Sequence, residues 1–201
     1  MRDLIIYKAE INPDPESDLE VNFMGLVGKP AVERNFQVFK EQYSKFSVDE
    51  EKRIISGVAM IADMPIYRRD KDLGEFYVVF DKPSIQKIVE KFSYKGYLRN
   101  INLFHDTTLA DDKSVIFNSF ISDKEIGIHP PKGFEDVPDG SWFISIKVNT
   151  DETWERVKAG DLKGFSIEGL FNYIPVAKIR MTAEALAAQI EYLLNNTEII
   201  D

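Results

Sequence analysis

Along most of this chain, apolar residues either alternate with polar ones or form short runs bounded by turn residues, and both patterns are typical of β-strands. The segment 64–73 is charged and contains a proline, so it is predicted to be a loop or hairpin tip. Residues 36–46 have no clean period and fit either a strand pair or a frayed helix. The predicted strands are residues 1–8, 21–27, 54–61, 75–80, 99–105, 115–121, 142–148 and 165–173.

Three segments show the spacing of a helix with one buried face. The first begins at Pro83 and ends at Gly96, the second begins at Thr150 and ends at Gly160, and the third spans 182–196. Because helices and strands do not alternate regularly, the pattern predicts an α+β domain built on an antiparallel sheet or barrel.

The composition indicates one soluble globular domain over residues 1–201. A net charge of -9 with no basic stripe argues against nucleic acid as a partner. The chain has no cysteine, which excludes disulfides and thiolate nucleophiles. No apolar run is long enough to cross a bilayer, and charged residues interrupt the first apolar run too early for a secretory signal. We therefore expect no membrane partner.

The strongest candidate for chemistry is Ser166, which lies between Gly164 and Gly169 on a predicted strand. A serine needs a base to take its proton, and imidazole is the usual base. The chain has two histidines. His129 is followed by two prolines and is expected in a loop, so His105 is the candidate base. The alternatives are that His105 is only an edge histidine and that the two glycines only punctuate a strand.

On a regular strand, Ile101, Leu103 and His105 would share one face, with Asn102 and Phe104 on the other. Asp106 would then point away from His105 and would not be its partner.

A third group is expected to orient the imidazole. Glu168 lies on the same strand face as Ser166, roughly 6.6 Å along the strand. Asp123 is the second candidate, and the sequence leaves the choice open. No His-x-x-x-His pair, EF-hand loop or glycine-rich phosphate loop is present, so no metal or cofactor is expected.

The order of these features resembles one family. The motifs that carry the resemblance are Gly25 to Ala31, Ile55 to Met60, Ile66 to Arg68, Glu75 to Phe80, Asn102 to Asp106, Ser119 to Ile121, Trp142 to Val148, Trp154 to Gly160 and Gly164 to Gly169. Together, over residues 20–173, they are similar to the XkdF-type phage serine proteases. These are prohead proteases, which act in capsid maturation and are related to the herpesvirus assemblins.

The resemblance implies a distorted antiparallel β-barrel surrounded by short helices. It also implies that Ser166 is the nucleophile and His105 the general base. The expected substrates are phage scaffold and major capsid proteins, cleaved inside the procapsid in the host cytoplasm, and a homodimer is a further expected partner. The alternative function is a non-catalytic barrel-fold protein of the phage particle that is structural or binds scaffold.

Overall fold

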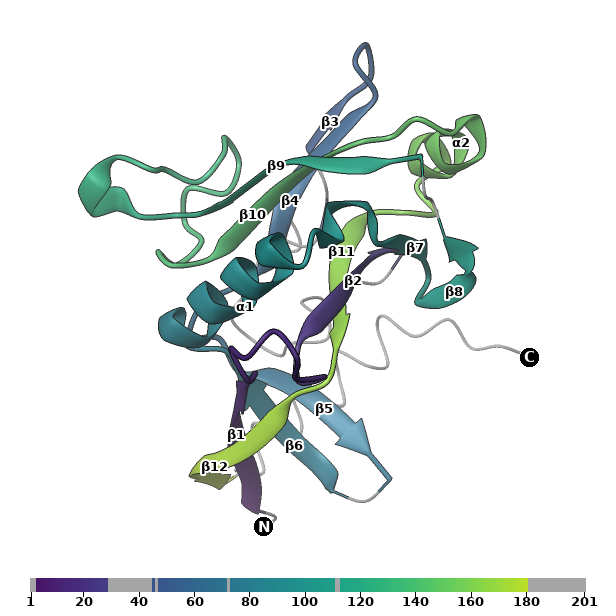
Figure 1. Cartoon of the computed structure of the whole chain (residues 1–201). Helices are drawn as coiled ribbons and strands as arrows, with labels where there is room; N and C mark the ends of the chain where they lie inside the picture. Colours follow the sequence, from purple (N-terminus) through teal and green to yellow (C-terminus); the bar gives the residue numbers. More distant parts are fainter. Residues whose placement is uncertain (1–2, 29–44, 46, 72, 111–112, 181–201) are drawn as a thin grey trace.

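The computed structural model describes residues 3–28, 45, 47–71, 73–110 and 113–180. Within these ranges the chain forms three four-stranded sheets (Figure 1). The first has the order β12-β1-β6-β5, the second β3-β4-β10-β9 and the third β11-β2-β7-β8. The strands are β1 (Asp3–Glu10), β2 (Val21–Val27), β3 (Ser47–Asp49), β4 (Ile54–Met60), β5 (Ile66–Asp70), β6 (Gly74–Val79), β7 (Ile101–Leu103), β8 (Asp106–Ala110), β9 (Val115–Ile121), β10 (Trp142–Lys147), β11 (Gly164–Gly169) and β12 (Asn172–Arg180).

Two α-helices, α1 (Lys82–Tyr94) and α2 (Asp151–Ala159), and two short 3-10 helices, η3 (Tyr97–Arg99) and η4 (Lys124–Ile126), complete the described elements. The predicted α+β class is confirmed. The expected closed antiparallel barrel is not found: within the described ranges the strands form three separate sheets, and β1 pairs with β6 and β2 with β7 in parallel. Apolar patterning indicates which face of a strand is buried but not which strand is its neighbour, so parallel pairs between distant segments escaped the prediction.

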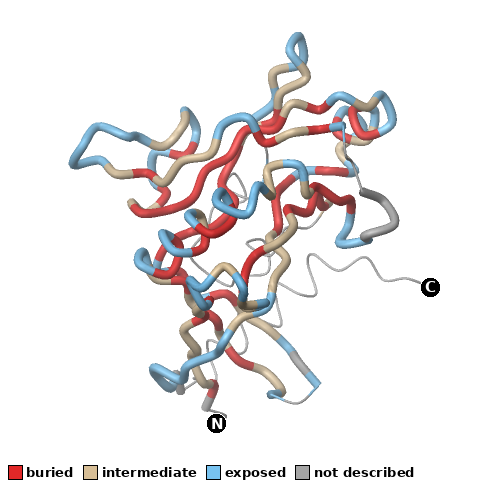
Figure 2. Tube along the Cα trace, in the orientation of Figure 1, coloured by how far each residue is buried: buried red, intermediate tan, exposed pale blue. Residues whose placement is uncertain are grey.

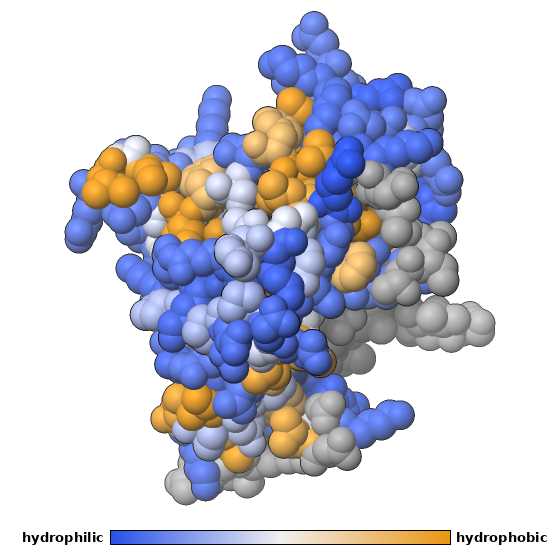
Figure 3. Space-filling view, in the orientation of Figure 1, coloured by the Kyte–Doolittle hydropathy of each residue, from blue (hydrophilic) through white to orange (hydrophobic). Residues whose placement is uncertain are grey.

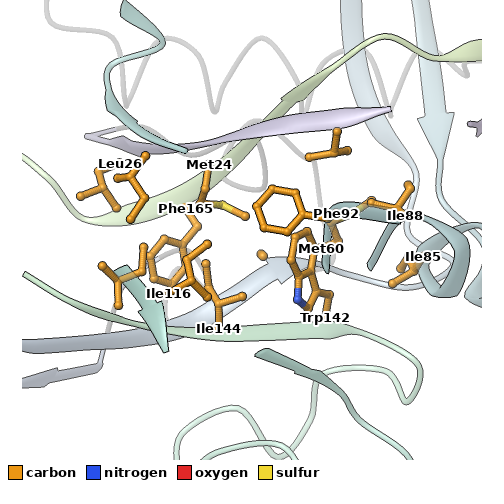
Figure 4. Packing of buried hydrophobic residues seen from close by; sticks show 14 of the residues in the cluster. Met24, Leu26, Met60, Ile85, Ile88, Phe92, Ile116, Trp142, Ile144 and Phe165 are labelled. Atoms are coloured by element: carbon orange, nitrogen blue, oxygen red, sulfur yellow. The ribbon is translucent and has the colours of Figure 1, made fainter. Parts of the chain in front are cut away.

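The core lies between the second and third sheets and under α1. Figure 2 shows buried residues concentrated along β2, β4 and β10. In Figure 4, Met24 and Leu26 of β2 and Phe165 of β11 face Ile144 of β10, while Phe92 of α1 packs against Trp142. The two rings make an edge contact with centroids 5.3 Å apart. Burial of each large apolar side chain contributes about 1.5–3 kcal/mol, so this layer is a major source of stability.

The alternation of Trp142, Ile144, Ile146 and Val148 with other residues predicts a strand with one buried face, but both faces of β10 are buried. Residues 142–146 are all buried, including Ser145 between the apolar positions. The strand lies in the middle of its sheet, paired with β4 on one side and β9 on the other. Elements cover both of its faces, and a small polar residue fits the second face because Ser145 shares a hydrogen bond with Ser56 of β4 (2.8 Å).

Helix α1 follows the predicted signals. The Asp81 side chain caps its first turn by accepting a hydrogen bond from the backbone N–H of Ser84 (2.9 Å), and Pro83 lies in that turn. The buried face includes Ile85, Ile88 and Phe92. After the helix, Gly96 adopts a left-handed conformation with φ of 73°. The helix therefore begins and ends where the sequence indicates.

Two other predictions need correction. The segment 64–73, predicted to be a loop or hairpin tip, does lead into a hairpin turn, but most of it is strand β5, which pairs with β6. Its charged residues lie on an edge strand, where charge is tolerated and disfavours pairing with other chains. The predicted strand 165–173 is instead two strands, β11 and β12, in different sheets. The predictions for 36–46 and 182–196 lie outside the described residues, apart from residue 45.

Most of the face seen in Figure 3 is hydrophilic, in keeping with the net charge of -9. Apolar surface gathers near the η4 loop, where Ile126 and Ile128 are exposed, and near β12, where Tyr173, Ile174 and Val176 are exposed. No helix in the described part of the chain is long and apolar enough to span a membrane.

Candidate active site

The candidate site lies on one face of the third sheet, where β11, β2 and β7 run side by side (Figure 1). In their register, Ser166 is opposite Gly25 and Gly25 is opposite Asn102. Successive residues of a strand point to opposite faces of its sheet. Met24, Leu26 and Phe165 point into the core, so the residues between them, Gly25 and Ser166, belong to the other face. Asn102 and Glu168 join this face by the same alternation.

His105 reaches this face from a tight turn. Leu103 of β7 pairs with Asp106 of β8, so Phe104 and His105 form a two-residue hairpin loop. Their φ angles are 57° and 61°, and positive φ at both loop positions defines the turn type that best fits a twisted hairpin. Asparagine and glycine are the usual residues at such positions, so an aromatic residue followed by histidine is costly here. Such backbone strain is concentrated at functional sites in proteins.

This turn corrects the predicted geometry of the segment. The strand was expected to continue to His105 and to place that residue on the face of Ile101 and Leu103. It ends at Leu103 instead, and the two positive φ angles reverse the chain. The His105 ring consequently lies on the same sheet face as Asn102, whereas regular alternation would have placed the two residues on opposite faces.

The His105 ring contacts Glu168 directly. Its Nδ1 atom lies 2.8 Å from Oε1 of Glu168, and the same oxygen accepts a hydrogen bond from Nδ2 of Asn102 at 2.5 Å. An ionised carboxylate can only accept, so Nδ1 is the donor in this pair. The other ring nitrogen, Nε2, is then the one that can accept a proton. The His105 side chain is 40% exposed and that of Glu168 25% exposed, so the pair lies at the protein surface.

Gly25 makes room for this ring. A Cβ atom on Gly25 would lie 3.0 Å from Cε1 and 3.1 Å from Nδ1 of His105, and 3.3 Å from Oδ1 of Asn102. Contacts of this length are tighter than real Cβ atoms usually make. The imidazole therefore packs on the backbone of Gly25. This residue lies on the central strand β2, between Ser166 of β11 and Asn102 of β7.

Ser166 pairs with Gly25, on which this ring packs, and it is largely buried, with 7% of its surface exposed. Paired residues on antiparallel strands have Cβ atoms about 4.5–5.5 Å apart, so the Ser166 Cβ lies within about 8.5 Å of Cε1 of His105. Among the residues that the structure describes, no hydrogen bond joins the Ser166 hydroxyl to the His105 ring. Catalytic hydrogen bonds are often longer without substrate and tighten in the complex.

Asp123 has a different place in the structure. It precedes η4 in the β9–β10 connection, and its side chain accepts hydrogen bonds from the backbone N–H groups of Glu125 (3.1 Å) and Ile126 (3.4 Å). Its backbone forms a bridge with Ile128. Its side chain thus caps a 3-10 helix in the second sheet's long connection, whereas the carboxylate on the His105 ring is that of Glu168.

Two contacts tie the turn to its surroundings. The backbone N–H of Phe104 donates to the carbonyl of Leu26 on β2 (2.9 Å), which anchors the loop to the central strand. The Arg156 guanidinium of α2 lies 5.7 Å from the centre of the Phe104 ring, a cation–π contact. Phe104 is 42% exposed, so an aromatic ring and a cation lie at the surface directly beside His105.

Sequence reasoning missed two residues of this site, Gly25 and Asn102. The close approach of a ring to Gly25 becomes visible only when β2 and β7 are known to be neighbours. Asn102 was assigned to the face opposite His105. A signal existed, because an asparagine between Ile101 and Leu103 on a short apolar strand predicts a buried amide that needs a partner.

The residues of this site do not suggest a metal centre. Within the described part of the chain, no group of three histidine, cysteine, aspartate or glutamate side chains is placed to hold an ion. A hydroxyl, an imidazole and a carboxylate are the side-chain groups that nucleophilic acyl transfer requires.

Comparison with known proteins gives two matches. A family model described as "Putative phage serine protease XkdF" matches residues 43–174, more than half of the 201-residue chain. The "Phage-like element PBSX protein XkdF" of Bacillus subtilis (strain 168) is 24% identical over 140 residues, which are 70% of this chain and 43% of that protein. The chain thus spans less than half the length of this relative.

No solved structure matches the chain. An assemblin-like relation therefore stays a prediction. The matched range includes Asn102, His105, Ser166 and Glu168, and it begins after β2. Given the extent of that match, the chain belongs to the family described as "Putative phage serine protease XkdF".

Proposed function

We propose that this protein is a serine endopeptidase in which Ser166 is the nucleophile, His105 the general base and Glu168 the group that orients the imidazole. The observation that carries the proposal is the 2.8 Å contact between Nδ1 of His105 and Oε1 of Glu168, on the sheet face that also bears Ser166. Family membership supports the same reaction class.

The reaction follows from these roles. Nε2 of His105 takes the proton of the Ser166 hydroxyl as the oxygen forms a bond to the peptide carbonyl carbon. The resulting imidazolium is stabilised by the Glu168 carboxylate at Nδ1 and gives its proton to the leaving amine as the C–N bond breaks. A water molecule then attacks the ester carbonyl, losing a proton to Nε2, and Ser166 regains a proton as the acid product leaves.

The proposed substrates are phage proteins. The matched relative carries the name of a phage-like element, and the family is described as a phage protease. Cleavage of scaffold and major capsid proteins inside a procapsid, in the host cytoplasm, would be the biological reaction, and a homodimer would be the acting form. The exposed Phe104 ring with Arg156 beside it lies where a substrate chain would pass His105.

The decisive experiment is co-expression of the protein with the scaffold and capsid proteins of its own particle. The Ser166→Ala variant is expected to leave both substrates uncut, whereas wild type cuts them. Ser122→Ala is the matched control: Ser122 is also buried, and its hydroxyl has no hydrogen-bond partner in the described part of the chain, so the substitution removes no hydrogen bond seen there. A fluorophosphonate probe should label wild type at Ser166 and leave Ser166→Ala unlabelled.

A second function, a non-catalytic structural or scaffold-binding role, is supported by one observation. The Ser166 hydroxyl forms no hydrogen bond with His105 within the described part of the chain. Normal substrate cleavage by Ser166→Ala would exclude Ser166 as the nucleophile. Binding of scaffold by wild type without cleavage or labelling would favour the structural role.

A further inference from the structure

Asn102 is fully buried, with 0% of its surface exposed, and its two polar groups are treated differently. Nδ2 donates to Oε1 of Glu168 at 2.5 Å, whereas Oδ1 is a buried acceptor with no hydrogen-bond partner among the residues that the structure describes. An unpaired buried acceptor lowers stability, and most buried polar atoms in proteins are paired. This orientation of the amide therefore lowers the stability of the folded state.

The partner of Nδ2 explains this orientation. If the amide were rotated by half a turn, Oδ1 would face the Glu168 carboxylate and two acceptors would repel each other. The unpaired Oδ1 instead faces the space beside Gly25, 3.3 Å from where a Cβ atom would lie. The amide thus satisfies the carboxylate at the expense of its own oxygen.

Glu168 needs such a restraint. Its side chain is 25% exposed, so solvent competes for its carboxylate, and Asn102 and His105 are the side chains that contact it. Both contact the same oxygen, Oε1: Asn102 from β7 and His105 from the turn between β7 and β8. Without the buried donor, only the partly exposed imidazole would hold this carboxylate in place.

We propose that Asn102 is a positioning residue: its buried amide fixes the Glu168 carboxylate, which in turn fixes the orientation of the His105 ring. The role in catalysis rests on the proposed peptidase function, but the chain of polar contacts from Asn102 through Glu168 to His105 does not. The proposal can therefore be tested with and without an assay of cleavage.

The main variant is Asn102→Leu, which keeps the approximate shape and removes both the donor and the unpaired acceptor. Because misplacement by about 1 Å costs on the order of 10²-fold in rate, kcat should fall by roughly that factor with KM unchanged. Thermal stability should be kept or raised, because the unpaired Oδ1 is gone. The matched control is Asn100→Leu, since Asn100 flanks the same strand and its side chain donates only to a backbone carbonyl, that of Asn22 (2.8 Å). The control should lose stability and keep kcat.

A second variant, Asn102→Asp, keeps the shape and places a carboxyl group against Glu168. Two carboxylates at hydrogen-bonding distance share a proton at low pH and repel when both are ionised. The shared proton would replace the lost donor, so activity should recover on the acid side, and the pH of maximal kcat should lie below that of wild type. A residue with a purely structural role would not move this maximum.

The third readout needs no substrate. The chain has two histidines, so the ring resonances of His105 and His129 can be distinguished by NMR, and His129 serves as an internal reference. In wild type, the hydrogen-bonded Nδ1 proton of His105 should give a sharp downfield signal. In Asn102→Leu this signal should broaden or vanish. An unchanged signal together with an unchanged kcat overturns the positioning role. If wild type cleaves nothing, the proposed function fails, and the NMR comparison alone still decides the inference about Asn102.

Discussion

The imidazole of His105 packs directly on the backbone of Gly25, too closely for a Cβ atom at that position to fit without a shift of the ring. A Cβ atom on Gly25 would lie 3.0 Å from Cε1 of this ring. The nearest atoms belong to the partly exposed His105 side chain, so an added Cβ atom would push the ring itself by a few tenths of an ångström. The position of the candidate base therefore depends on a residue on another strand that has no side chain.

Gly25→Ala should displace the ring while leaving the fold intact. The added methyl group would cost about 1–3 kcal/mol in overpacking, and kcat should fall on the order of 10²-fold because the base moves away from Ser166. Steady-state kinetics and denaturant unfolding measure both effects. The control is Gly57→Ala on β4, where a Cβ atom would make an ordinary contact at 3.4 Å with Phe165. If Gly25→Ala kept wild-type kcat, the ring position seen here would not matter for activity.

Glu168 and Asp123 can be distinguished by a pair of substitutions. Glu168→Gln removes the negative charge beside Nδ1 of His105, and comparable changes in serine proteases lower kcat by up to about 10⁴-fold. We expect kcat to fall roughly 10²- to 10⁴-fold, measured with a peptide that contains the cleavage site of the natural substrate.

Asp123→Ala should have the opposite profile. Loss of the two backbone hydrogen bonds at η4 should cost about 0.5–2 kcal/mol of unfolding free energy and leave kcat unchanged. A large fall in kcat for Asp123→Ala with normal activity of Glu168→Gln would identify Asp123 as the third member instead.

The sequence predicted part of the site: it gave Glu168 as a partner for His105, but it left Asp123 open and missed Gly25 and Asn102. Placing Glu168 on the face of Ser166 needs only the two-residue period of a strand, and the contact between Glu168 and His105 is indeed observed. Its catalytic role stays a prediction. The sheet face of His105 was predicted wrongly, because the segment is a strand only to Leu103 and then turns.

The sequence does not reveal which strands pair with each other when they are far apart along the chain. Nothing local in Val21–Val27 indicates that its neighbours are β11 on one side and β7, in parallel, on the other. That arrangement brings Gly25 under His105 and Asn102 next to Glu168. It also explains why the barrel expectation failed, since alternation predicts the faces of strands but leaves the order of strands in a sheet open.

Lys91 illustrates the same limit in the core. Its position on α1, three residues after Ile88, belongs to the apolar face, and its side chain is only 3% exposed. The ammonium donates to the backbone carbonyls of Asn12, Asp14, Ser17 and Leu19, at 2.9, 2.8, 2.7 and 3.4 Å. It also lies 3.4 Å from Oε2 of Glu20. The loop between β1 and β2 is thus held to the helix by one buried cation.

Lys91→Met should therefore be strongly destabilising although it makes the helix more apolar. Removing one partner of a buried ion pair typically costs about 3–5 kcal/mol, and here carbonyl groups also lose their donor. Denaturant unfolding measures the change. Lys95→Met is the control, because Lys95 is 29% exposed and lies 3.6 Å from the same carboxylate, and its loss should cost less than about 1 kcal/mol. Equal losses of unfolding free energy in the two variants would show that the buried contacts of Lys91 contribute no more to stability than the exposed contact of Lys95.

The same cluster predicts a dependence of stability on pH. Burial opposes ionisation of Glu20, but the Tyr97 hydroxyl, which donates to Oε1 at 2.6 Å, together with Lys91 and Lys95, holds the pKa of this carboxyl below its ordinary value of 4.5. A carboxyl with a lowered pKa stabilises the folded state above its unfolded pKa, and this contribution is lost as the pH falls through the folded value. The stability difference between wild type and Glu20→Gln should thus be constant near neutral pH and shrink below pH 4.5. Unfolding curves recorded from neutral to acid pH measure it. A difference that stays constant into the acid range would show that the charge of Glu20 does not contribute to stability.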